Sequence, residues 1–345
     1  MIDLKTSRFK RLLQWNSALV LIMILEIAAF GAINARFLRV DMLLGSFNDF
    51  AAICIIALFE TFVVITGGID ISVGSIIGLV STVVGVAWKV GHMSIGTAVL
   101  LGLFVGLLCG ALNGFIIAFT DVQPMVVTLG SMMLFSGVAL VVAGAAGTSA
   151  SEGISGLPQS FVNLANGSVG FVPNLLLLFL ALAVLTYILL HRTKFGRYVF
   201  LIGINRNTAR YSGVNTRAVV MSTYLLADFG AALAGVVQTA YIGGSRPDLG
   251  STSLMSILTA VFLGGTAMTG GKGGIIGSAI AGILIAFLNF GLQMAGVASQ
   301  YVNVGIGVVL VLSVVVRGAT DENSIIYKTI WNYKKKRRGK AVAKA

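Results

Sequence analysis

The sequence predicts an all-α, polytopic membrane protein with about ten transmembrane helices in a single transmembrane domain over residues 1–345. Of the 345 residues, 57% are hydrophobic and only 10% are charged, whereas an ordinary soluble domain is about one quarter charged. The apolar residues form long runs, and about 20 such residues carry a helix across the hydrocarbon layer. Only short polar breaks separate these runs, as expected for a helical bundle that bonds its backbone internally in lipid.

Each apolar run is assigned to one helix. The runs lie near 17–33, 43–66, 71–90, 95–119, 124–146, 172–190, 218–243, 254–268, 273–295 and 299–317. The first follows a basic stretch, but its length and the runs after it indicate an uncleaved helix rather than a signal peptide. The eighth is short for a membrane crossing, so we expect a short or re-entrant segment there.

Basic residues are distributed unevenly among the loops. The chain has 24 Lys and Arg against 12 Asp and Glu, a net charge of +12. With the N-terminus in the cytoplasm, 20 basic residues fall on the cytoplasmic side and only Arg36, Arg39, Lys89 and Arg246 on the other. Cytoplasmic loops of membrane proteins collect Lys and Arg. We therefore place both termini in the cytoplasm and explain the charge without a nucleic-acid partner.

Three polar segments stand out from the predicted helices. An outer loop, 147–171, is long enough to cover a pore mouth or to meet an external partner. The longest cytoplasmic loop, 191–217, is strongly basic and is either a solvated topology signal or a docking element. A basic cytoplasmic tail follows at 318–345.

Glycine recurs at four-residue spacing, most regularly from Gly102 to Gly114 in the fourth run and again at Gly74 with Gly78 and at Gly273 with Gly277. Small residues on one helix face let two backbones approach closely, so tight helix packing is the favoured interpretation. A weak internal echo also links TGGIDISVGSIIG at 66–78 with LGGTAMTGGKGGIIG at 263–277. Repeats in transporters often contain broken helices that meet near the membrane midplane.

Motifs for catalysis and for cofactors are missing from the sequence. The phosphate-binding pattern G-x-x-x-x-G-K-[ST] fails at Lys272, because Thr266 replaces its first glycine and Gly273 its last residue. The two histidines, His92 and His191, lie at opposite ends of distant helices, and the two cysteines show no metal-ligand spacing. We therefore expect no catalytic residues, no metal and no cofactor in this chain.

Acidic residues inside the predicted spans are functional candidates, because an ionisable group in the bilayer is costly. Glu60 and Asp228 are the most deeply placed, whereas Glu26 and Asp49 lie nearer to helix ends. We favour hydrogen bonds between helices for Glu60 and Asp228. The alternative is a proton or sodium relay in an ion-coupled secondary carrier.

Four ordered motifs, together with Asn113-Gly114, resemble hallmarks of the ribose/xylose-type permeases of ABC sugar importers. The motifs are GGIDISVGS (67–75), PMVVTLG (124–130), GRYVFLIGINRNTARYSGVN (196–215) and LGGTAMTGGKGGIIG (263–277). Further stretches are similar to the autoinducer-2 import branch of that family: EIAAFGAIN (26–34), EGISGLP (152–158), GGSRPDLG (243–250) and GLQMAGV (291–297). Like that branch, the chain lacks the family's usual acids, having Leu254-Met255 before the eighth run and Arg206-Asn207 in the cytoplasmic loop.

The resemblance implies a non-enzymatic permease subunit of an ATP-driven importer in a bacterial inner membrane. Its partners would be a paralogous permease forming a heterodimer, two copies of an ABC ATPase that uses ATP and Mg, and an extracytoplasmic solute-binding protein. The implied cargo is the quorum-sensing signal autoinducer-2, with ribose, rhamnose or another small sugar as the alternative. The departures from the family's acids leave the contacts with the ATPase open.

The resemblance also implies that the loop 191–217 docks into the ATPase. A short helix would span Asn205–Ser212, with Gly203 and Gly213 permitting the turns. The residues expected to couple the two subunits are Gly203, Asn205, Ala209, Ser212 and Gly213.

Polar residues near the predicted helix breaks are candidates to line the translocation path, since half-helix ends leave backbone groups that can meet a passing solute. Each of them could equally cap a helix or bond a neighbour. The candidates are Asp70, Ser72, Ser75, Asn113, Thr128 and Asn289.

Overall fold

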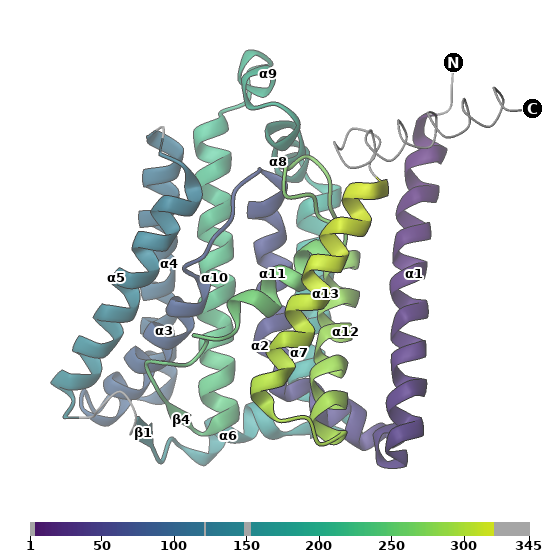
Figure 1. Cartoon of the computed structure of the whole chain (residues 1–345). Helices are drawn as coiled ribbons and strands as arrows, with labels where there is room; N and C mark the ends of the chain where they lie inside the picture. Colours follow the sequence, from purple (N-terminus) through teal and green to yellow (C-terminus); the bar gives the residue numbers. More distant parts are fainter. Residues whose placement is uncertain (1–3, 121, 148–152, 321–345) are drawn as a thin grey trace, which may run out of the picture.

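A computed structural model describes residues 4–120, 122–147 and 153–320 (Figure 1). Its long helices run roughly side by side, in agreement with the predicted all-α bundle. The α-helices are α1 (Leu4–Ile33), α2 (Val40–Ile65), α3 (Val73–Lys89), α4 (Ile95–Phe119), α5 (Pro124–Ala145), α6 (Gln159–Asn166), α7 (Asn174–Arg192), α8 (Lys194–Ile204), α9 (Arg206–Tyr211), α10 (Thr216–Ile242), α11 (Leu254–Leu263), α12 (Ile275–Met294) and α13 (Ser299–Thr320). A 3-10 turn, η1 (Ala35–Leu38), joins α1 to α2. Four two-residue strands are β1 (Ile154–Ser155), β2 (Ser168–Val169), β3 (Val172–Pro173) and β4 (Gly244–Ser245).

A helix occupies each of the ten predicted runs, although not all of these helices have the length of a membrane span. Among the described residues, seven helices are long and apolar enough to cross a membrane: α1, α2, α4, α5, α7, α10 and α12. Helix α3 is shorter, and α11 has only ten residues. At 1.5 Å per residue α11 extends about 15 Å, roughly half the hydrocarbon thickness. The expectation of a short eighth segment is therefore confirmed.

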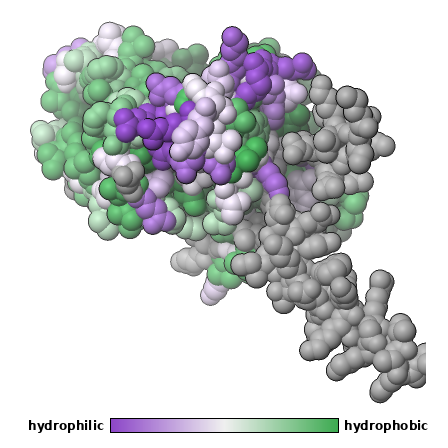
Figure 2. Space-filling model, turned by 90° about the horizontal axis from the view of Figure 1, so that it is seen from above, coloured by the Kyte–Doolittle hydropathy of each residue, from purple (hydrophilic) through white to green (hydrophobic). Residues whose placement is uncertain are grey.

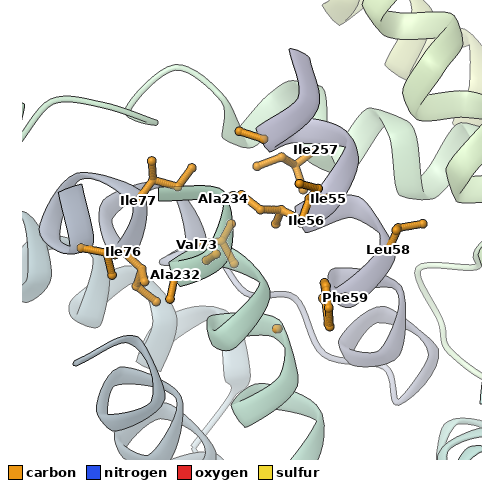
Figure 3. Packing of buried hydrophobic residues seen from close by; sticks show 14 of the residues in the cluster. Ile55, Ile56, Leu58, Phe59, Val73, Ile76, Ile77, Ala232, Ala234 and Ile257 are labelled. Atoms are coloured by element: carbon orange, nitrogen blue, oxygen red, sulfur yellow. The ribbon is translucent and has the colours of Figure 1, made fainter. Parts of the chain in front are cut away.

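The core lies where α2, α3, α10 and α11 meet. Helices α2 and α10 are the innermost long helices, with 78% and 67% of their most apolar stretches buried. Figure 3 shows Ile55 and Ile56 of α2, Ile77 of α3 and Ala234 of α10 packed together near Ile257 of α11. These helices are enclosed by other helices rather than by water, so their sequences form continuous apolar runs.

The outer helices keep most of their apolar surface uncovered. In α4, α5 and α7 only 22–28% of the most apolar stretch is buried, and in α1 only 11%. Exposed side chains such as Leu100, Met133 and Val141 would be unfavourable in water, but hydrocarbon accommodates them. This exposure agrees with the prediction of a bundle in lipid.

The glycines of α4 pack against α10, as their spacing predicted. A Cβ atom on Gly106 would meet Ala232, one on Gly110 would meet the backbone at Leu225, and one on Gly114 would meet Met221. Small residues therefore let the two helix backbones approach closely.

The glycines of α3 receive a loop instead of a helix. A Cβ atom on Gly74 would lie 2.7 Å from the carbonyl oxygen of Gly250, and one on Gly78 would meet the carbonyl oxygen of Pro247. The segment 246–253, which follows β4, thus runs along α3 before α11 begins. Helix–helix packing, expected for this stripe, is wrong here, because a chain segment without regular structure fits the glycine face equally closely.

The two ends of the molecule differ in structure, and we call them the α9 end and the α6 end. Helices α8 and α9 lie at the first, together with the start of α1 and the end of α13 (Figure 1). Seen from this end, hydrophilic residues gather beside hydrophobic ones (Figure 2). The exposed basic side chains of this end include Arg192, Lys194, Arg197, Arg206, Arg210, Arg217 and Lys272.

The α6 end is closed by short elements that connect distant parts of the chain. Helix α6 lies across the end of α10. Strand β1 pairs with β4 in antiparallel register, Ile154 opposite Ser245, while β2 and β3 form a hairpin. The predicted outer loop 147–171 therefore contains a helix and strands. Its residues 148–152, and most of the predicted tail 318–345, lie outside the described residues.

Candidate functional site

The chain between α2 and α3 is interrupted and folds back along α2. Helix α2 ends at Ile65, Gly67 adopts a φ of +85°, and α3 begins only at Val73. The amide N–H of Asp70 donates to Oε1 of Glu60 at 3.0 Å. Because Glu60 lies more than one helical turn before the end of α2, this bond brings the interrupted segment back into the bundle.

The side chain of Asp70 organises the entry into α3. Its Oδ1 accepts from the amide of Ser72 at 2.8 Å and from the Ser72 hydroxyl at 2.6 Å. This Asx-type turn satisfies backbone groups that a broken helix leaves open. The Ser75 hydroxyl then donates to the carbonyl oxygen of Ser72 at 2.7 Å. Each of these hydrogen bonds replaces one that the backbone would form in an uninterrupted helix.

Two neighbouring helices complete the cluster from the other side. Asn113 on α4 donates to the Ser72 hydroxyl at 2.9 Å and to Oδ2 of Asp228 on α10 at 3.0 Å. The carboxyl groups of Asp70 and Asp228 lie close enough to each other to interact directly. We call Glu60, Asp70, Asn113, Tyr224 and Asp228 the acidic cluster.

The acidic cluster is buried and only partly bonded. Glu60, Asp70, Asn113 and Asp228 are fully buried, and Tyr224 is 1% exposed. Each has one oxygen atom without a hydrogen-bond partner in the structure. A buried polar atom without a partner costs about 1–3 kcal/mol, so the arrangement must hold protons, water or another ligand that contributes the missing bonds.

Among the predicted path residues, five meet at this break. Asp70, Ser72, Ser75 and Asn113 form the bonds given above, and the Thr128 hydroxyl on α5 donates to the Ile69 carbonyl oxygen at 3.2 Å. Asn289 lies apart on α12 and donates to Ile285 of its own helix at 2.8 Å. All six are buried in this conformation, and a contact with a passing solute stays a prediction.

Tyr224 is the member of the cluster that sequence reasoning missed. Its hydroxyl lies so close to Gly68 that no Cβ atom fits there. The residue stands four positions before Asp228 on α10, and residues four apart share one helix face. The four-residue spacing from Asp228 was the sequence signal for Tyr224. Which residues lie opposite that face of α10 is visible only in the tertiary structure.

The second break lies between α11 and α12, and glycine fills it. Gly265, Gly270 and Gly271 all have positive φ values. The amide of Gly271 donates to the carbonyl oxygen of Ile65 at 2.8 Å, which joins this break to the end of α2. A Cβ atom on Gly270 would lie 2.9 Å from the amide nitrogen of Gly67, so the two segments of the internal echo touch each other.

Gly203 of α8 enters the same contact, and we call Ile65, Gly203 and Gly271 the glycine junction. A Cβ atom on Gly203 would overlap the carbonyl oxygen of Ile65 and the amide of Gly271. Gly203 lies inside α8, so the expectation that it permits a turn is wrong. Its function is to allow three backbone segments to meet.

The predicted short helix of the cytoplasmic loop is present as α9. Asn205 caps it by accepting from the amide of Thr208 at 2.9 Å, and Ser212 ends it. Gly213 has a φ of +81°, so the turn expected at this residue is confirmed. Ala209 is 2% exposed and packs into the core rather than outward.

Helix α9 presents polar and aromatic side chains to the outside. Tyr211 is 91% exposed, the highest value among the large apolar side chains described. Arg206 and Arg210 are exposed on the same short helix, and no acidic residue lies between 191 and 217. A helix of this kind is suited to contact with another protein, because its backbone is capped and its position is set by the glycine junction.

Interrupted helix pairs, buried polar side chains at the break and a lipid-exposed rim define a membrane transport protein of the permease class. This chain belongs to the family described as branched-chain amino acid transport system / permease component, whose family model matches residues 42–314. It is a multi-pass permease subunit of an ABC importer and resides in a bacterial inner membrane. The expected class, transport type and location are thereby confirmed.

Individual relatives are similar over nearly the whole chain. The autoinducer 2 import system permease protein LsrD of Salmonella paratyphi A is 42% identical over 306 residues, 89% of this chain and 92% of the relative. LsrD of Yersinia enterocolitica is 42% identical over 314 residues, 91% and 95% of the two chains. LsrD of Escherichia coli is 43% identical over 306 residues, 89% and 92%. No solved structure matches this chain.

Proposed function

We propose that this chain is a permease subunit of an ATP-driven importer of autoinducer-2. The observation that carries the proposal is the 42% identity to LsrD permeases over about nine tenths of both chains. Apart from Glu152, which lies outside the described residues, the branch-specific stretches are part of the described fold. For example, GGSRPDLG forms β4 and the loop on α3.

The arrangement of the two ends supports an assignment of sides. The start of α1, the end of α13 and the exposed basic residues of α8 and α9 all lie at the α9 end. Since Lys and Arg concentrate on the cytoplasmic side, the α9 end faces the cytoplasm and both termini lie there. The ABC ATPases that use ATP and Mg bind at this end, and the solute-binding protein binds at the α6 end.

The translocation path forms between this chain and a paralogous permease. Within one chain the polar residues of the first break are buried and bonded to each other. A solute reaches Asp70, Ser72 or Asn113 only after the break moves away from α4 or α10. ATP-driven movement at the cytoplasmic end supplies such a change.

Helix α9 is the element that receives this movement. It is exposed, and α8 carries it directly to the glycine junction at the end of α2. The first break follows that end of α2, so displacement of α9 pulls on the segment that holds Asp70. The basic residues Arg206 and Arg210 indicate an acidic groove in the ATPase, because opposite charges complement each other across an interface.

Reconstitution tests the cargo. The chain is combined in proteoliposomes with its partner permease, ATPase and binding protein, and uptake of labelled autoinducer-2, ribose and rhamnose is compared. ATP-dependent uptake of autoinducer-2 above both sugars is expected. Preferred uptake of ribose or rhamnose would overturn the cargo. Uptake by this chain alone, driven by an ion gradient, would revive the secondary-carrier alternative.

Substitution of Tyr211 tests the docking role without disturbing the fold. Gly203 and Ala209 are unsuitable, because bulky residues there would clash inside the protein. We expect Tyr211→Ala to reduce solute-stimulated ATPase activity and ATPase pull-down at unchanged membrane insertion. Tyr301→Ala is the matched control, since Tyr301 is also exposed, at 67%, but lies at the start of α13. Equal ATPase binding by both variants would remove α9 from the interface.

A further inference from the structure

Three carboxyl groups meet in the acidic cluster without a basic partner. The ion pairs found among the described side chains join Arg39 to Asp41 and Arg246 to Asp248, and neither involves the cluster. The described residues also contain no group of His, Cys, Asp or Glu that could hold a metal ion. Three ionised carboxylates in this place would be strongly unfavourable, because charges repel most strongly in the low-dielectric interior where these residues are buried.

The unpartnered hydroxyl of Tyr224 gives a second, independent observation. It is buried beside Gly68, and its nearest charged neighbours include Glu60, Asp70 and Asp228. A tyrosine hydroxyl both donates and accepts hydrogen bonds. Its position among unpaired carboxyl oxygens indicates that mobile hydrogen atoms complete the network.

We propose that the acidic cluster is a proton-binding site, in which Asp70 and Asp228 share one proton and Glu60 holds a second. Two carboxyl groups approach to hydrogen-bond distance only when one of them carries the hydrogen, as in other acidic pairs that share a proton. The proton leaves one charge on the pair, which the amide of Asn113 and the Ser72 groups stabilise by donated bonds. Glu60, without a cation, binds its proton and remains neutral.

The bound protons hold the first break against α10. Asn113 links Asp228 of α10 to Ser72 of the break, and the shared proton adds a direct bond between the neighbouring carboxyl groups of Asp70 and Asp228. Loss of the shared proton converts this bond into a repulsion between two charges. The folded state therefore binds more protons than the unfolded state, and its stability falls as pH rises.

Few titratable groups surround the cluster. Within it, Glu60 comes from α2 and Tyr224 from α10, and outside it Cys109 faces it from α4. Arg206 at the start of α9 is the basic residue whose charge acts on Tyr224. Helix α5 has no titratable side chain, and α3 has only Lys89 at its last residue.

Variants of Asp228 test the shared proton in the full-length chain in lipid nanodiscs. Asp228→Asn donates the same hydrogen bond from an amide that does not titrate, whereas Asp228→Ala removes it. We expect the Tm of the wild-type protein to fall between neutral and alkaline pH, and that of Asp228→Asn to fall less. Asp228→Ala should have a lower Tm than Asp228→Asn at every pH. Asp49→Asn is the control and should show the wild-type pH dependence, because Asp49 is exposed and bonds Tyr241 outside the cluster.

Infrared difference spectroscopy of the wild-type protein gives an answer that does not depend on folding of the variants. A signal of protonated carboxyl groups should persist at neutral pH and should shift in Glu60→Gln. Spectra that contain only ionised carboxylates, or an Asp228→Asn variant no more stable than Asp228→Ala, would overturn the proposal. Stabilisation of the wild-type protein by Na⁺ or K⁺ would overturn it as well, because a bound cation would then replace the protons. Neither measurement depends on which solute is imported.

Discussion

The two breaks of the bundle have similar sequences but are stabilised in different ways. The first, 66–72, is held by side chains, since Glu60, Asp70 and Ser72 supply the bonds that the interrupted helix lacks. The second, 264–274, is held by backbone contacts, with Gly271 bonded to Ile65 and glycine at each close approach. The same motif can therefore interrupt a helix in two ways. It can place polar side chains at the break, or it can allow backbone segments to pack closely there.

Our proposals assign different functions to the two breaks. The first lies deep in the bundle and would carry the groups that bind protons or meet a solute. The second joins α8, α11 and the end of α2 near the α9 end, and would transmit displacement rather than bind a ligand. Four substitutions test this division, given from the largest expected effect to the smallest.

Gly203→Val should have the largest effect, because its side chain would overlap the backbone at Ile65 and Gly271. Overpacking costs about 1–3 kcal/mol where side chains can yield, and more where backbone must move. We expect little folded protein by size-exclusion chromatography in detergent. Gly137→Ala is the control, since a Cβ atom there meets open space. Normal folding of Gly203→Val would contradict the close backbone contact at the glycine junction.

Glu60→Ala should come next, because it removes the acceptor for the Asp70 amide and leaves that group buried without a partner. The expected loss is about 2–3 kcal/mol in the free energy of unfolding, the penalty for such a group plus a small cavity. Thermal unfolding of the purified protein measures it. Glu60→Gln keeps the acceptor and should recover most of the loss; a glutamine variant as unstable as the alanine variant would contradict this account.

Asn113→Ala should weaken the first break by about 1–3 kcal/mol, because its amide bridges Ser72 and Asp228. The loss should be smaller than in Glu60→Ala, since no backbone amide is left unpaired. The ratio of the two Tm shifts checks the order. A larger loss of stability in Asn113→Ala than in Glu60→Ala would mean that the Asn113 bonds stabilise the break more than the bond between Asp70 and Glu60 does.

Gly67→Ala should have the smallest effect. Its φ of +85° strains any other residue, but a Cβ atom would have only the Thr269 carbonyl oxygen nearby, at 3.8 Å. The expected cost is about 1–2 kcal/mol of backbone strain. A small fall in Tm with retained uptake would agree. A loss as severe as that of Gly203→Val would mean that the first break, too, depends on close backbone packing.

Hydrophobic patterning alone predicted most of the helices. The runs at 95–119 and 124–146 correspond to α4 and α5 within one residue, because an apolar run must be helical in lipid to satisfy its backbone. The helix at Asn205–Ser212 was predicted from the resemblance, and the structure adds its cap. Burial of Asp228 was predictable from the apolar residues around it.

The partners of those residues were decided only by the tertiary structure. Nothing in the sequence brings Asp70 to Asp228, or Gly203 to Ile65, because contacts between residues far apart depend on how the helices pack. The glycine face of α3 shows the same limit, since its spacing predicts close approach but does not say whether a helix or a loop approaches. The sequence by itself determined an all-α membrane bundle, the positions of its apolar helices, and the presence of breaks and buried acids. The packing decided that one break became an acidic cluster and the other a backbone junction.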